Sequence, residues 1–136
     1  MPARKTFLGL DVGDRRIGLA LGDSEVKIAV PFGYVERGPE AIQKLTEIIL
    51  QHRVSVVVVG YPRNQSGEAT KQTEATELFV QELSEVDVDA KIVFQDESLT
   101  SVEAERRLGR VKDKGEIDAE AASIILQDYL EEKYGY

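Results

Sequence analysis

The sequence predicts an α/β domain in which one mixed five-stranded sheet carries helices on both faces. Residues 6–12 and 54–60 are apolar with few interruptions, as in strands that are covered on both sides. Residues 17–21 and 26–35 follow the first run at short spacing and indicate an antiparallel meander. Helical and strand patterns then alternate, which favours parallel strands joined by right-handed crossovers. The predicted element order is β-β-β-α-β-α-β-α-α.

Two helices in the middle of the chain are predicted from apolar side chains at helical spacing. Pro39 suits the first position of a helix that continues to near His52. Its apolar stripe consists of Ile42, Leu45, Ile48 and Ile49. A second helix is predicted over residues 68–84, after a loop over residues 61–67. The inner face of this second helix is expected to consist of Ala75, Leu78, Phe79 and Leu83.

One strand and two helices are predicted for the last third of the chain. Residues 91–95 form the last strand. A capping box that begins at Thr100 predicts a helix over residues 100–108. A basic loop follows, and a final amphipathic helix is predicted over residues 117–133.

Composition limits the chemistry that the chain can perform. The 136 residues predict a single domain, residues 1–136, and the net charge of −8 disfavours non-specific binding of nucleic acid or anionic membrane over the whole surface. Cysteine is absent and His52 is the one histidine, which excludes disulfides, thiolate nucleophiles and multi-histidine metal sites within one chain. His52 is expected at a solvated helix end. No signal-peptide pattern or membrane-spanning run is found, so we expect a cytoplasmic protein without a membrane partner.

Two groups of acidic residues stand at strand positions. Asp11 interrupts an otherwise buried strand, where an ionised carboxylate costs several kcal/mol unless it is paired or bound to a cation. The alternative is a strand-end residue that hydrogen-bonds the turn at Gly13. Asp96 and Glu97 follow the last strand, and they could instead begin the next helix. Successive strand residues point to opposite faces, so only one of the two is expected to face a given site.

Asp118 begins the stripe of the final helix that must pack on the sheet. The stripe continues with Ala121, Ala122, Ile125, Leu126 and Tyr129. The alternative for Asp118 is a helix N-cap. Sites in open α/β sheets form outside the carboxyl ends of the strands, where Asp11 and the pair Asp96 and Glu97 are expected. If the final helix starts at the same edge, Asp118 joins them.

Such a cluster of carboxylates needs compensation. Two carboxylates about 5 Å apart repel by roughly 3 kcal/mol at an effective dielectric near 20. With no cysteine and one histidine, oxygen ligation of Mg²⁺ or Mn²⁺ is favoured, and Zn²⁺ is less favoured. One or two such ions suit hydrolysis of a phosphodiester.

Basic residues are expected around the same edge, where they could contact phosphates. Arg15 and Arg16 follow Asp11, and the loop over residues 61–67 carries Arg63 and Asn64. A basic cluster near the end of the chain is either a phosphate contact or a solvated charged segment. It lies in and beside the loop over residues 109–115 and consists of Arg106, Arg107, Arg110, Lys112 and Lys114.

Four segments in order resemble the signature blocks of the YqgF/RuvX family. They are F-L-G-L-D-V-G-D-R-R-I-G-L-A-L-G-D, V-V-V-G-Y-P-R-N-Q-S-G, Q-D-E-S-L-T-S-V-E-A and I-D-A-E-A-A-S-I-I-L-Q-D-Y-L, between about residue 7 and residue 130. The resemblance implies a ribonuclease H-like fold. It also implies a metal-dependent endonuclease, with a ribosomal RNA precursor (the 5′ end of pre-16S rRNA) or branched DNA such as a Holliday junction as substrate.

The resemblance also implies roles for individual residues. Asp11, Glu97 and Asp118 would form the catalytic and metal-binding set, with Asp96 as a neighbour. The family usually has arginine after the acidic pair, whereas this chain has Ser98, so either Arg63 or Arg106 substitutes for it or the activity is weaker.

Three questions stay open from the sequence. The segment D-V-G-D-R-R-I-G also resembles the phosphate-binding hairpin of actin-like phosphotransferases, although those enzymes use two domains. A non-catalytic RNA-binding assembly module is a further alternative. A monomer and a homodimer are both compatible with the tyrosines near the carboxyl end, Tyr129, Tyr134 and Tyr136.

Overall fold

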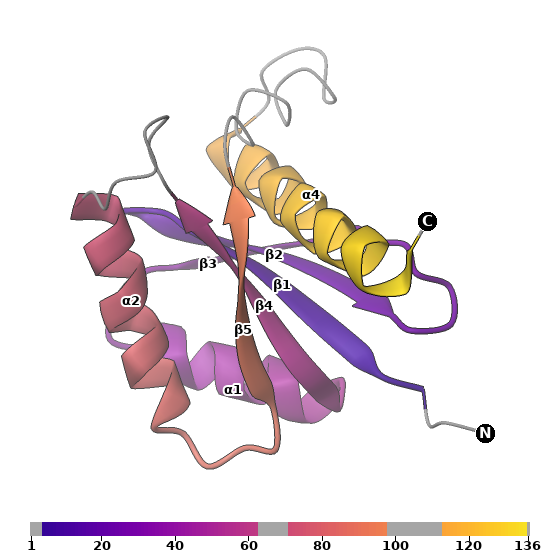
Figure 1. Ribbon diagram of the computed structural model, residues 1–136. Helices are drawn as coiled ribbons and strands as arrows, with labels where there is room; N and C mark the ends of the chain where they lie inside the picture. Colours follow the sequence, from indigo (N-terminus) through magenta and orange to yellow (C-terminus); the bar gives the residue numbers. More distant parts are fainter. Residues whose placement is uncertain (1–3, 63–70, 98–112, 136) are drawn as a thin grey trace.

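The fold is one mixed sheet between two helical layers (Figure 1). The computed structural model describes residues 4–62, 71–97 and 113–135. The strands are β1 (Thr6–Val12), β2 (Arg16–Asp23), β3 (Val30–Glu36), β4 (Val54–Pro62) and β5 (Lys91–Glu97). The helices are α1 (Ala41–Gln51), α2 (Lys71–Ser84) and α4 (Lys114–Tyr134).

The sheet has the order β3-β2-β1-β4-β5, with β1 at its centre. Strands β1, β2 and β3 are antiparallel neighbours, while β4 pairs parallel to both β1 and β5. The predicted fold class is therefore confirmed. Strand β5 extends two residues further than predicted, so Asp96 and Glu97 belong to the strand, paired in register with Tyr61 and Pro62.

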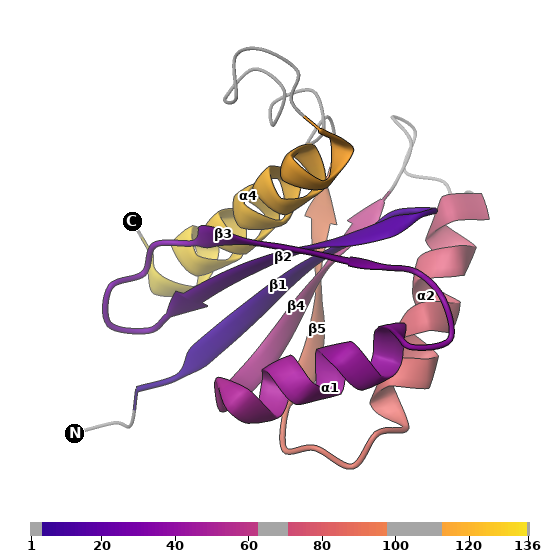
Figure 2. The ribbon, with the colours of Figure 1, turned by 180° about the vertical axis from the view of Figure 1, so that it is seen from behind.

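The two faces of the sheet have separate cores. Side chains alternate along β1, so that Leu8, Leu10 and Val12 pack with α1 and α2, and Phe7 packs with α4. Figure 2 shows α1 and α2 on one side of the sheet and α4 on the other. Because both faces are covered, the central strands have nearly continuous apolar sequences.

The inner face of α2 differs from the prediction. Phe79 and Leu83 are buried as expected, but Leu78 is 63% exposed, and the expectation that it packs inward is wrong. Thr73 and Thr76 are fully buried in its place, at positions three residues apart that continue to Phe79. The reason is the 3.6-residue period, since a helix that buries Thr76, Phe79 and Leu83 turns position 78 toward solvent.

The contrast between Leu83 and Leu78 predicts a difference in stability. We expect Leu83→Ala to lower the free energy of unfolding by about 2–5 kcal/mol, because it leaves a cavity in the core. Leu78→Ala removes the same atoms from an exposed site and is expected to change it by about 0.5 kcal/mol or less. Urea denaturation of the two variants measures both values, and equal losses would contradict this orientation of α2.

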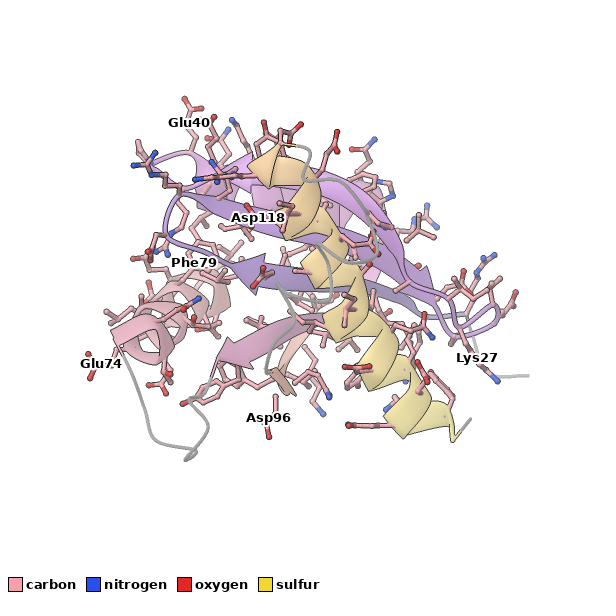
Figure 3. The ribbon with its side chains drawn as sticks, turned by 90° about the horizontal axis from the view of Figure 1, so that it is seen from above. Lys27, Glu40, Glu74, Phe79, Asp96 and Asp118 are labelled. Carbon is pink, nitrogen blue, oxygen red and sulfur yellow. The ribbon has the colours of Figure 1, made fainter. Side chains whose placement is uncertain are left out.

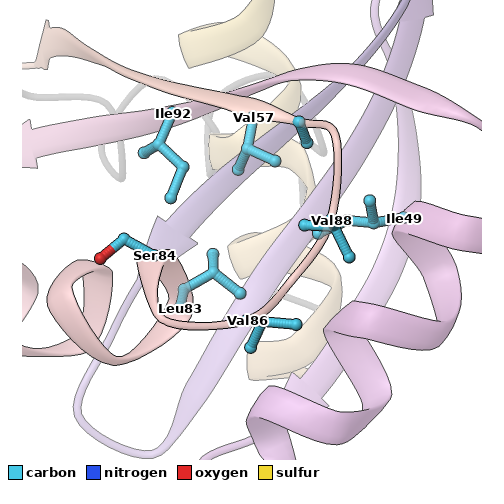
Figure 4. A pocket seen from close by; sticks show the side chains of 8 residues that line it. Ile49, Val57, Leu83, Ser84, Val86, Val88 and Ile92 are labelled. Carbon is cyan, nitrogen blue, oxygen red and sulfur yellow. The ribbon is translucent and has the colours of Figure 1, made fainter.

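An apolar cavity of about 290 Å³ lies between α1, α2 and the sheet (Figure 4). It is lined by aliphatic side chains including Ile49, Val57 and Ile92, with Ser84 as the polar contribution. The described residues of this lining include no charged or ionisable group. His52 lies apart from it, at the carboxyl-terminal end of α1 as predicted, with its ring 5.1 Å from that of Phe32. Within the described ranges, no helix combines the length and apolar character needed to cross a membrane.

Candidate active site

A row of three residues on neighbouring strands marks the site. Asp11 of β1 lies opposite Gly18 of β2, and Gly18 lies opposite Tyr34 of β3. Residues paired directly across strands share a face, and the face of this row is the one that α4 covers. A carboxylate and an exposed aromatic ring thus flank a position with no side chain.

Gly18 permits an unusually close approach of α4. A Cβ atom at this position would lie 1.9 Å from the carbonyl oxygen of Asp118 and 2.2 Å from its carbonyl carbon. A similar relation holds at Gly9, where a Cβ atom would lie 2.8 Å from Cβ of Leu126. Gly9 of β1 and Gly18 of β2 are offset by two positions in the register of these adjacent strands. Together they allow the helix to pack directly on the sheet. As a result, Asp118 lies over the row that contains Asp11.

Asp118 is not the helix cap. The N-cap of α4 is Asp113, whose side chain accepts a hydrogen bond of 2.8 Å from the backbone N–H of Glu116. The helix begins three residues earlier than predicted, at Lys114, which places Asp118 in its second turn. The side chain of Asp118 instead accepts a hydrogen bond of 2.9 Å at Oδ2 from Nε of Arg16.

Asp11 has the most strongly shifted pKa among the described residues of the site. Burial, and to a smaller extent the nearby negative charge of Asp118, together raise the pKa of its carboxyl from 3.8 to about 7. Among the residues that the structure describes, none gives Asp11 a hydrogen bond or an ion pair. The turn at Gly13 is closed by its own backbone bond to Arg16, so the alternative role of Asp11 as a turn residue does not hold.

This raised pKa predicts a pH dependence of stability. Because the folded-state pKa of Asp11 exceeds the unfolded value of 3.8, the folded protein binds more protons between about pH 4 and 7. The destabilising contribution of Asp11 therefore grows as pH rises through that window and is complete above pH 7. With EDTA present, we expect Asp11→Asn to be more stable than the parent at pH 8, by on the order of 3 kcal/mol.

The same comparison at pH 4.5 isolates the effect of ionisation. There most of the difference between the two proteins should be gone, because Asp11 is protonated in the folded parent and pH 4.5 lies only slightly above the unfolded-state pKa of 3.8. Urea unfolding at pH 4.5, 6 and 8 measures the trend. A difference that stays constant across these pH values would mean that the carboxylate is not strained by its surroundings.

The other predicted site residues divide between described and undescribed positions. Asp96 is exposed, and in the view onto the ends of β4 and β5 its side chain points away from Asp118 (Figure 3). Glu97 lies two residues after Gln95, which is buried and donates a hydrogen bond to Glu132 of α4. The backbone of Glu97 lies at the end of β5, and the side chain of Glu97 is not among those that the structure describes.

Among the predicted basic residues, Arg15 is exposed and Arg16 pairs with Asp118. The remaining predicted contacts lie outside the described residues, as does the predicted helix over residues 100–108. These contacts are Arg63, Asn64, Arg106, Arg107 and Arg110. Described Asp and Glu residues do not form a group of three that could hold a metal, and this set omits the Glu97 side chain.

Sequence reasoning missed two residues near the site. Tyr34 is 47% exposed and covers Gly115, where a Cβ atom would lie 2.2 Å from its ring. Arg37 donates a hydrogen bond of 3.1 Å to the carbonyl oxygen of Gly13, directly after β1, and its guanidinium lies 5.2 Å from the ring centre of Phe79. Neither residue stands in an unusual sequence pattern, because both contacts depend on the pairing of β3 with β2.

Comparison with known proteins places the chain in a family. Residues 5–132 match the family model RuvX, described as Holliday junction resolvase. The chain belongs to the RuvX family. A Chloroflexus aggregans relative named "Putative pre-16S rRNA nuclease" is 42% identical over 134 residues, covering 93% of this chain and 94% of the relative. A Chlamydia felis relative of the same name is 41% identical over 142 residues, covering 95% and 92%.

Solved structures extend the comparison to the fold. The T. thermophilus RuvC structure in complex with a Holliday junction substrate matches with a TM-score of 0.59 and 14% identity, over 96% of each chain. The fowlpox virus resolvase in complex with Holliday junction DNA matches with a TM-score of 0.58 and 9% identity, over 94% of this chain and 98% of the other. At these identities the likeness concerns the fold, which is ribonuclease H-like in this RuvX protein.

Proposed function

We propose that this RuvX protein is a metal-dependent endonuclease of the cytoplasm that processes the 5′ end of pre-16S rRNA. The observation that carries the proposal is the approach of Asp118 to Asp11 at the end of the central strand, in a chain whose 42%-identical relative is named as a pre-16S rRNA nuclease. The family description and the resolvase likeness favour Holliday junction DNA as the second candidate substrate.

The residues present fit a hard divalent cation. Asp11 is a carboxylate in a poorly hydrated position, it has no partner among the described residues, and a second carboxylate raises its pKa. A cation between Asp11 and Asp118 compensates the burial and the mutual repulsion that raise the pKa of Asp11. Oxygen donors suit Mg²⁺ or Mn²⁺. When bound, such an ion stabilises the charge that develops on a phosphate undergoing hydrolysis.

Glu97 is proposed as the third ligand in preference to Asp96. Gln95 faces α4, and the alternation of a strand assigns position 97 to the same face and position 96 to the opposite one. Asp11 holds its proton up to about pH 7, so it must lose that proton before it can act as an anionic ligand. Asp118 is fixed by α4, whose position over the sheet is set by Gly18.

The test compares substrates directly. The parent protein and Asp11→Asn are incubated with a pre-16S rRNA 5′ fragment and with a four-way DNA junction, each with Mn²⁺. We expect cleavage of the rRNA fragment by the parent alone. Cleavage of the junction but not of the fragment would reverse the choice of substrate. RNA binding by both proteins without cleavage by either would favour a non-catalytic assembly module.

Tight ATP binding is the outcome expected of an actin-like phosphotransferase. Calorimetric titration of the parent protein with ATP and Mg²⁺ measures it, and we expect no saturable binding. This control separates the two classes of enzyme that share the D-V-G-D-R-R-I-G segment.

A further inference from the structure

We propose that the Arg16 guanidinium is the positive partner of Asp118 in the metal-free protein, and that a divalent metal ion binds by displacing this guanidinium from the carboxylate. The inference rests on the proposed metal site and deepens it. It assigns Arg16 as a positioning residue that competes with the ion, in place of the phosphate contact that its position after Asp11 first predicts.

The contact itself carries the first step. Nε of Arg16, at the first residue of β2, donates to Oδ2 of Asp118 at 2.9 Å, across 102 residues of sequence. The side chains are 23% and 25% exposed, so the pair is partly withdrawn from water. Charge-assisted bonds of this kind are stronger than those between fully exposed side chains. Arg16 therefore holds the Asp118 side chain in a fixed orientation without any metal.

The distribution of charge carries the second step. Two carboxylates, Asp11 and Asp118, interact closely enough for one to raise the pKa of the other, yet the described part of the chain gives a cationic partner to Asp118 alone. A divalent ion that neutralises both must approach Asp118, where the guanidinium already stands. Like charges at this range repel by several kcal/mol at a low effective dielectric. The ion and Arg16 cannot both engage Oδ2 of Asp118.

The ion pair with Asp118 and the repulsion between the guanidinium and the metal ion together mean that Arg16 weakens ion binding. In the ion-free protein the guanidinium compensates part of the carboxylate repulsion, which favours the close seat of α4 on Gly18. Ion binding replaces this compensation with a stronger one and releases the side chain of Arg16. Loss of Arg16 should therefore tighten ion binding, whereas loss of a residue with a merely structural role would leave it unchanged or weaken it.

Arg15 offers a matched control. It precedes Arg16 directly and is exposed, and among the residues described it forms no side-chain ion pair. Arg15→Gln and Arg16→Gln change the net charge equally and differ only in the contact with Asp118. Any long-range electrostatic effect on the ion is expected in both variants.

The experiment measures ion binding and the state of the guanidinium. Calorimetric titration with Mg²⁺, without nucleic acid, gives the dissociation constant of the parent and of both variants. We expect Arg16→Gln to bind Mg²⁺ about fivefold to twentyfold more tightly than the parent, and Arg15→Gln to stay within about twofold of it. Nitrogen-15 spectra of the arginine side chains then report on the bond itself.

In those spectra the Nε–H resonance of Arg16 is assigned by through-bond experiments on the parent protein. It should exchange slowly with water in the ion-free parent, and saturating Mg²⁺ should shift it and speed its exchange. This measurement uses the parent protein, so it holds even if Arg16→Gln folds poorly.

The possible outcomes separate this inference from the proposed function. If Mg²⁺ binds the parent but the Arg16 resonance stays unchanged, or if Arg16→Gln binds Mg²⁺ more weakly, displacement is overturned while the metal site stands. If Mg²⁺ does not bind the parent at all, the metal site and this inference both fail.

Discussion

Asp11→Asn is expected to abolish nucleic-acid cleavage, with a loss of at least about a thousandfold, and to abolish stabilisation by divalent ions. In the parent, an ion at a hundred times its dissociation constant adds about 2.7 kcal/mol to the free energy of unfolding. For a domain of this size that corresponds to a rise in Tm of roughly 10 °C. Asparagine keeps the shape of the side chain but removes the charge that attracts the ion.

Scanning calorimetry with and without 5 mM Mg²⁺ or Mn²⁺ measures the shift, and Asp89→Asn is the control. Asp89 is exposed in the segment before β5, so its substitution changes the net charge equally at a position outside the site. This control should retain both cleavage and the rise in Tm. A full metal-dependent shift in Asp11→Asn would show that the ion binds elsewhere.

Gly18→Ala is expected to disrupt the site without touching a carboxylate. The new Cβ atom would lie 1.9 Å from the carbonyl oxygen of Asp118, a backbone atom, and an ordinary contact needs at least 3.4 Å. The helix must therefore move away from β2 and take Asp118 with it. We expect a loss of about 3 kcal/mol or more in the free energy of unfolding. A displacement of about 1 Å at a catalytic group reduces the rate by about a hundredfold.

Gly22→Ala is the matched control for this substitution. Gly22 lies on the same strand, four residues further along, and its Cβ atom would meet its nearest neighbour at 3.1 Å, in a contact that small shifts relieve. We expect Gly22→Ala to lose less stability and to keep the Tm rise with Mg²⁺, whereas Gly18→Ala should lose that rise. Equal metal-dependent shifts in both variants would contradict the role of Gly18 in placing Asp118.

The strands and the unusual positions of two acids were predictable because each depends on a local pattern. An acid inside the apolar run of β1 and an acid at the head of the buried stripe of α4 are both anomalous where they stand, whatever their distant neighbours are. The buried stripe behind Asp118, which includes Ala122 and Leu126, also packs on the sheet as predicted.

The contacts that join these acids were not predictable from local patterns. In the sequence, Gly18 is an ordinary strand glycine. Only the register of β1 and β2 places it opposite Asp11 and beneath Asp118. The pair of Arg16 with Asp118 depends on the same register. The cap at Asp113 and the exposure of Leu78 depend on helix boundaries and phase, which sequence patterns define to within a few residues.

Helix α4 crosses all five strands and is the last element in the described sequence. During translation, Asp11 leaves the ribosome long before Asp118, and until α4 emerges the elements that the structure describes cover only one face of the nascent sheet. The candidate catalytic pair is therefore completed by the same event that closes the second core. A partly synthesised chain would hold neither, so the candidate site stays incomplete while the chain is still being made.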